Sequence, residues 1–97
     1  MKQFTTGSDA GSVRIGNENF TVLIPNGYGD GLTNVYVLEE NENICDFTKK
    51  ANYFTRIEGT FNIYDDDCWK DPTALITLKG GYSAWYFNGE VWFKKEE

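Results

Sequence analysis

The pair Asn88-Gly89 constrains the fold of this chain more than any other short stretch, because it separates two runs of β-forming residues, YSAWYF and EVWFKK. A two-residue type I′ turn needs positive φ at both central positions, and Asn and Gly adopt positive φ more readily than other residues. The stretch therefore predicts a β-hairpin. Its directly opposed pairs would be Phe87 with Glu90, Tyr86 with Val91, Trp85 with Trp92 and Ala84 with Phe93.

A second glycine pair, Gly80-Gly81, predicts another tight turn and so a meander that begins near Leu75. This turn would set Leu78 against Ser83 and Ile76 against Trp85, and would sort the side chains onto two faces. An almost wholly apolar face is expected to be core: Ile76, Leu78, Trp85, Phe87 and Trp92. The other face is mixed: Leu75, Thr77, Lys79, Tyr82, Ala84, Tyr86, Val91, Phe93 and Lys95. Either a helix covers this mixed face or a partner does.

The first half of the chain predicts further strands. Residues 12–24 alternate in polarity on both sides of GNEN, which indicates a hairpin, and PNGYGDG then forms a loop before the strand NVYVLEE. Between residues 42 and 54 the apolar spacing changes to three and four residues, which predicts a short amphipathic helix carrying Phe47 and capped by Asn41 or Asn43. RIEGTFNIYDDD returns to strand alternation, with Gly59 as a candidate bulge.

These elements predict an α+β fold that is mostly β. We expect a small antiparallel sheet of hairpins and a meander, with about six to seven strands and one short helix packed against it. A chain of 97 residues has room for one modest core, so residues 1–97 are expected to form a single compact domain.

Charge and apolar content restrict the partners and the compartment. Fifteen carboxylates against nine basic residues give a net charge of −6, which disfavours direct binding to nucleic acid and favours a protein partner with a basic surface. Neither a membrane span nor a signal peptide is apparent, so a cytoplasmic location without membrane binding is expected. In that compartment Cys45 and Cys68 would be free thiols, and a disulfide between them stays open if the chain is exported.

Few residues in the sequence suggest a catalytic or metal-binding site. The chain lacks histidine, which excludes Ser-His-Asp and Cys-His catalysis and mixed Cys/His zinc sites. Carboxylates crowd the stretch YDDDCWKD at Asp65, Asp66, Asp67 and Asp71, but their spacing does not match a calcium-binding EF-hand loop. The loop PNGYGDG lacks the Lys and Ser/Thr of a phosphate-binding P-loop. We therefore expect no enzyme activity, no catalytic residues, no cofactor and no metal.

The sequence favours a non-enzymatic acidic binding or inhibitory protein. Such proteins, small and acidic, are used by phages and bacteria to block a nuclease, a toxin or a defence complex. The residues expected to contact the partner are acidic or aromatic: Asp65, Asp66, Asp67, Asp71, Tyr28, Asp30, Tyr82, Tyr86 and Phe93. Two alternatives stay open, a β-module that binds a sugar or nucleotide and a structural subunit of a larger assembly, and a homo-oligomer is open as well.

Overall fold

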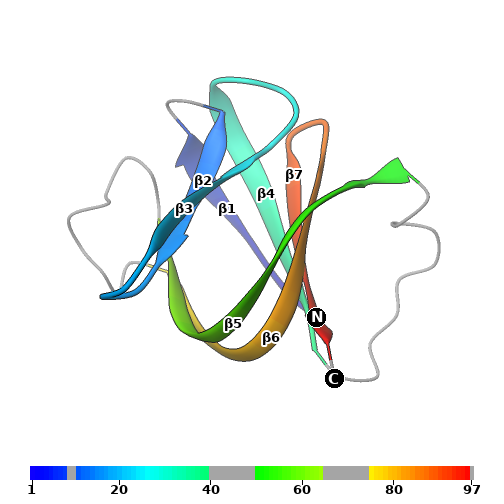
Figure 1. Cartoon of the computed structure of the whole chain (residues 1–97). Coiled ribbons are helices and arrows are strands. Elements are labelled where there is room, and N and C mark those ends of the chain that lie inside the picture. The colour runs from blue at the N-terminus through cyan, green and yellow to red at the C-terminus, as the bar shows by residue number, and fades with distance from the viewer. Residues whose placement is uncertain (9–10, 40–49, 65–74, 97) are drawn as a thin grey trace.

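Seven β-strands in one curled sheet make up the architecture of the computed structural model, which describes residues 1–8, 11–39, 50–64 and 75–96 (Figure 1). The strands are β1 (Lys2–Ser8), β2 (Ser12–Gly16), β3 (Thr21–Pro25), β4 (Gly31–Leu38), β5 (Asn52–Tyr64), β6 (Ile76–Phe87) and β7 (Glu90–Glu96). Their order across the sheet is β1-β4-β7-β6-β5-β2-β3, and the sheet curls into a half-barrel. The prediction of a mostly β fold is confirmed.

The sheet is mixed, which corrects the expectation of a purely antiparallel one. β4 and β7 run parallel, with Val35 opposite Val91 and Val37 opposite Phe93, while the other neighbouring strands are antiparallel. Turn signals in a sequence reveal only antiparallel neighbours that follow each other along the chain. β4 and β7 are far apart in the sequence, so no local sequence pattern predicts their pairing.

Both strong hairpin predictions are confirmed. β6 and β7 pair in the expected register around Asn88 and Gly89, whose φ values of 40° and 87° suit a type I′ turn. β2 and β3 also form a hairpin. Its turn is closed by the side-chain oxygen of Asn17, which accepts hydrogen bonds from the N–H groups of Asn19 (2.7 Å) and Phe20 (3.2 Å).

The predicted turn at Gly80-Gly81 is wrong, because β6 continues through both glycines and pairs them with Gly59 and Glu58. Side chains from the neighbouring strands explain the glycines. A Cβ atom added to Gly81 would lie 2.6 Å from Nη2 of Arg56, and one added to Gly80 would lie 3.0 Å from Nζ of Lys95. The glycines thus make room for two long side chains that cross the strand.

The missing turn changes which residues form the core. Because β6 does not reverse, Leu78 lies on the same face as Tyr82 and Ala84, and this face points into the curl of the sheet. The buried cluster there is Val13, Ile15, Ile24, Val35, Val37, Ile57, Phe61, Ile63, Leu78, Tyr82, Ala84, Val91 and Phe93. Trp85, Phe87 and Trp92, which were expected in the core, lie outside this cluster. Trp92 is 5% exposed and belongs to a second, smaller cluster with Leu38.

The predicted helix is corrected where it can be compared. None of the elements formed by the described residues is a helix; Phe47 lies outside those residues, and Asn52–Phe54 begin β5 instead. The predicted bulge is also displaced, since the register of β5 against β6 shifts between Tyr53 and Thr55 and not at Gly59. Pairing along a neighbouring strand thus overrode the helical spacing of Phe54.

Candidate binding surface

The glycine-rich loop after β3 is a fixed structure organised by Asn26, whose side chain is fully buried. Its Nδ2 donates to the carbonyl oxygen of Gly29 and to Oγ1 of Thr33, both at 2.9 Å. Its Oδ1 accepts from the N–H groups of Tyr28 (2.8 Å) and Gly29 (2.9 Å). All the polar atoms of this side chain are therefore used to hold the loop.

The backbone of Asn26 ties the loop to two other parts of the sheet. Its N–H donates to the carbonyl of Gly11, and its carbonyl accepts from the N–H of Gly89, both at 2.8 Å. Gly27 packs so closely on the ring of Tyr86 that an added Cβ atom would lie 3.1 Å from it. The loop is thus fastened to the turn between β6 and β7.

This loop presents Tyr28 to solvent. The side chain is 70% exposed, and its Cβ lies 3.9 Å from the position a Cβ would take on Gly89. An exposed aromatic residue on an exposed loop is common, but here the backbone on both sides of the ring is held by hydrogen bonds to Asn26. Tyr28 is therefore an exposed ring on a fixed support.

Further aromatic side chains lie around the same end of the sheet. Tyr53, Phe54 and Phe87 are 56%, 41% and 36% exposed. The rings of Phe54 and the half-buried Tyr86 meet edge to face at 6.2 Å between centroids. The ring of Tyr53 instead meets Trp85 at 5.3 Å between centroids, and Tyr53 and Phe87 lie on the opposite face of the sheet from Tyr86, because successive residues of a strand alternate between faces. We call Tyr28, Phe54 and Tyr86 the aromatic surface.

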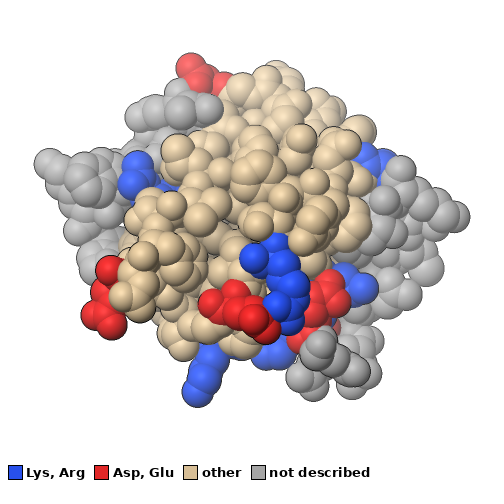
Figure 2. All heavy atoms as spheres, viewed as in Figure 1, with Lys and Arg blue, Asp and Glu red and all other residues tan. Residues whose placement is uncertain are grey.

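Charged side chains are sparse over this end of the molecule. Figure 2 shows a broad uncharged area across the upper part of the face, over the loop after β3 and the tip of the β6–β7 hairpin, with an acidic side chain at its top edge and a basic one at its right edge. The visible Lys, Arg, Asp and Glu side chains lie mainly along the lower part and the rim. Lys50, whose Nζ lies 6.0 Å from the ring centroid of Phe87, marks one border. An uncharged centre with a charged rim is typical of a protein-binding surface.

The acidity of the chain belongs mostly to segments outside the described residues. Nine of the fifteen carboxylates lie there, including Asp65, Asp66, Asp67 and Asp71, against two of the nine basic residues. The described strands and loops carry seven basic and six acidic residues. Cys45 and Cys68 also lie outside the described part of the chain, so neither thiol can be placed.

Two open hollows lie against β5 between Thr55 and Tyr64. The larger, of about 840 Å³, is lined mainly by polar residues together with two aromatic rings: Asn17, Glu18, Asn19, Phe20, Glu58, Gly59, Thr60, Asn62 and Tyr64. The smaller, of about 290 Å³, is lined by Phe20, Val22, Thr55, Arg56, Ile57 and Glu58. Both hollows have Phe20 and Glu58 in their linings.

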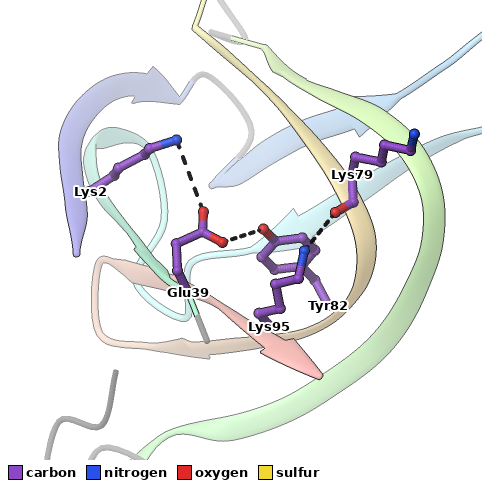
Figure 3. Close-up of polar contacts among 5 residues, drawn as sticks. All are labelled: Lys2, Glu39, Lys79, Tyr82 and Lys95. Carbon is purple, nitrogen blue, oxygen red and sulfur yellow. Dashed lines mark hydrogen bonds and ion pairs between the residues drawn. The ribbon is translucent and has the colours of Figure 1, made fainter. Parts of the chain in front are cut away.

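Tyr82, expected to contact a partner, is a core residue whose hydroxyl reaches the rim of the sheet (Figure 3). The hydroxyl donates to Oε2 of Glu39 at 2.9 Å, and Lys2 approaches Oε1 of the same carboxylate at 4.0 Å. Nζ of Lys95 lies 5.3 Å from the centroid of the Tyr82 ring and donates to the carbonyl of Lys79. This polar cluster connects β1, the end of β4, β6 and β7, and so stabilises the sheet.

The outer face of the sheet carries a further aromatic pair. The rings of Tyr36 and Trp92 stack at 4.1 Å between centroids. Burial, and then the neighbouring carboxylate of Glu90, which accepts from the Tyr36 hydroxyl at 3.4 Å, raise the pKa of Tyr36 above its ordinary value.

The structure brings together only some of the residues expected to contact a partner. Tyr28 and Asp30 are exposed and Tyr86 is half-buried, whereas Tyr82 and Phe93 are 2% and 0% exposed and so offer no surface. Sequence reasoning missed the exposure of Tyr53, Phe54 and Phe87. The position of Phe87 beside the Asn-Gly turn could have indicated exposure, because hairpin tips extend beyond the core.

No protein-family model, curated protein or solved structure matches this chain. Within the described ranges, no helix is both long and apolar enough to cross a membrane. Those ranges also contain no group of three or more His, Cys, Asp or Glu residues placed to hold a metal ion. Inferences about function therefore depend on the surfaces described above.

Proposed function

We propose that this protein is a non-enzymatic binding protein that engages a partner protein through its aromatic surface. The observation that carries the proposal is Tyr28, a 70% exposed ring on a loop whose backbone forms three hydrogen bonds with the buried side chain of Asn26. A loop whose backbone is already held in place loses little conformational entropy when it binds. Tyrosine is also among the residues that contribute most to protein interfaces.

The charges of the chain indicate what kind of surface this partner should carry. The acidic residues between the strands, Asp65, Asp66, Asp67 and Asp71 among them, would attract a partner with a basic surface and speed the encounter. The uncharged aromatic surface would then supply the contact area. An inhibitor of a nucleic-acid-handling or toxin protein fits this combination, since such targets carry basic surfaces.

The proposal is tested by affinity capture from cells of the source organism with three forms of the protein: wild type, Tyr28→Ser and Leu23→Ser. Leu23 is a matched control, because it is 45% exposed but lies on the edge strand β3. We expect a protein captured by wild type and by Leu23→Ser to be lost with Tyr28→Ser, with a dissociation constant raised about tenfold or more in the purified pair. Equal capture by all three forms would refute the role of the aromatic surface.

Salt separates the two contributions. Capture should weaken as the salt concentration rises if the acidic residues steer the encounter, and an Asp65/Asp66/Asp67→Asn triple variant should lose this dependence. A triple variant that keeps the full salt dependence would remove the acidic residues from the mechanism while leaving the role of Tyr28 untouched.

A second candidate is suggested by the larger hollow beside β5. Its lining combines side-chain amides and carboxylates with the rings of Phe20 and Tyr64, a combination suited to a neutral polyhydroxylated ligand such as a sugar. Calorimetric titration with a panel of simple sugars, comparing wild type with Phe20→Ala, distinguishes this function. Binding abolished by Phe20→Ala but not by Tyr28→Ser would favour the ligand module.

A further inference from the structure

One edge of β5 is open over its middle. The strand pairs with β6 along nearly its whole length on one side, but on the other side it pairs with β2 only through Asn62–Tyr64. The side-chain Nδ2 of Asn17 donates to the carbonyl of Thr60 at 2.8 Å and extends this contact slightly. From Thr55 to Gly59 no described strand pairs with this side, and β5 curves away from β2 (Figure 1).

The space beside the open edge is accessible. The smaller hollow, of about 290 Å³, lies against residues 55–58 of β5 and has Phe20 and Val22 on its far side. An unpaired strand edge presents N–H and C=O groups that can form hydrogen bonds with another strand. Natural proteins commonly block such edges with charged side chains or proline. Residues 55–59 contain no proline, and their two charges, Arg56 and Glu58, are of opposite sign.

The two charges are arranged symmetrically around Ile57. Arg56 and Glu58 point to the same side of the sheet, and in the single chain they pair with each other, with Nη1 of Arg56 2.7 Å from Oε1 of Glu58. Their side chains are 43% and 69% exposed. Arg56 lies over Gly81 of β6, so it must change rotamer to reach across the open edge, but the ion pair that it leaves is exposed and therefore weak.

We propose that two copies of this chain associate through an antiparallel β5–β5 pairing centred on Ile57. A two-fold axis through this residue places Arg56 of each copy opposite Glu58 of the other, so two opposite-charge pairs form on one face. The other two-fold registers close by lose this match. An axis through Glu58 would place Arg56 opposite Thr60, and an axis through Arg56 would place Glu58 opposite Phe54.

This dimer is distinct from the role of Tyr28 proposed above. Phe54 of the aromatic surface belongs to β5 and would lie opposite Thr60 of the other copy, but Tyr28 lies on a separate loop, and the pairing uses backbone groups and charges of β5. Loss of the dimer would leave capture of a partner by Tyr28 unaffected, and loss of capture would leave the dimer intact. The two proposals therefore fail separately.

Charge reversal tests the register. Arg56→Glu gives a chain with two acidic residues at these positions, and Glu58→Arg gives a chain with two basic ones, so each alone would oppose like charges across the axis. Analytical ultracentrifugation should show a dimer for wild type, with the dissociation constant raised about tenfold or more for each single variant. An equimolar mixture of the two variants should form a heterodimer with near wild-type affinity, because the opposed charges then match.

Controls keep the result interpretable. Lys79→Glu makes the same charge change as Arg56→Glu at an exposed position of β6 and should leave the dimer unchanged. A variant that merely failed to fold would not be rescued by mixing. Wild type that stays monomeric up to about 1 mM, or single variants that dimerise as tightly as wild type, would overturn the proposal.

Discussion

Replacing Asn26 with alanine should destabilise the protein more than its single side chain suggests. The substitution removes four hydrogen bonds of 2.8–2.9 Å in a fully buried place. At about 1 kcal/mol net for each bond, the free energy of unfolding should fall by about 4 kcal/mol. The buried hydroxyl of Thr33 loses its partner in the same change. A loss of this size is a large share of the roughly 5–15 kcal/mol that stabilises a typical domain.

Urea unfolding followed by tryptophan fluorescence measures this loss. Asn34→Ala is the matched control, because Asn34 is exposed and its side chain accepts one hydrogen bond, from Thr5 at 3.0 Å; its cost should stay within about 0.5 kcal/mol. If Asn26→Ala also cost less than about 1 kcal/mol, the loop would not depend on this side chain. The argument that Tyr28 stands on a fixed support would then fail with it.

Two further substitutions test contacts of buried and stacked tyrosines. Tyr82→Phe keeps the ring in the core but loses the hydrogen bond to Glu39, so urea unfolding should show a loss of about 1 kcal/mol, and an unchanged stability would mean that water replaces this bond equally well. Tyr36→Phe tests the raised pKa of Tyr36: the folded state holds this proton more tightly than the unfolded state, so the related stability is complete below pH 10 and is lost as pH rises through the folded pKa. The stability of wild type relative to Tyr36→Phe should therefore be constant below pH 10 and fall as the pH rises above 10. A difference that does not change with pH would contradict the shift.

The β6–β7 hairpin was predicted correctly because its signal is local. Asn88 and Gly89 adopt positive φ, and a two-residue turn fixes which residues face one another on both strands. The β2–β3 hairpin and the loop that holds Tyr28 and Asp30 followed from turn residues in the same way. In each case the residues that determine the geometry lie within a few positions of the residues that they position.

The Gly80-Gly81 prediction failed because a glycine pair is ambiguous without its neighbours. Glycine accommodates a turn, but it also leaves room for a side chain that crosses its strand. Here the crossing side chains are Arg56 and Lys95, from strands on either side of β6. Because of this one error, Tyr82 and Phe93 were predicted to lie outside the core, although they are buried, and Trp85 was predicted to lie in it.

The candidate surface was predictable only in part. Tyr28 and Asp30 were found from the glycine-rich loop, and Tyr86 from the hairpin register. Phe54 was assigned to a helix, although its ring lies against Tyr86 at the start of β5. Exposed aromatic residues cannot be separated from core residues by composition, because burial depends on which strands become neighbours.

The sequence by itself determined the mostly β character of the fold, its two hairpins and the exposed loop that carries Tyr28, since alternation and turn chemistry act over a few residues. Tertiary structure alone decided the parallel pairing of β4 with β7, the continuous β6, the face that became core and the open edge around Ile57. These features depend on contacts between strands that are distant in the chain. The sequence pattern of one strand does not indicate which distant strand will pair with it.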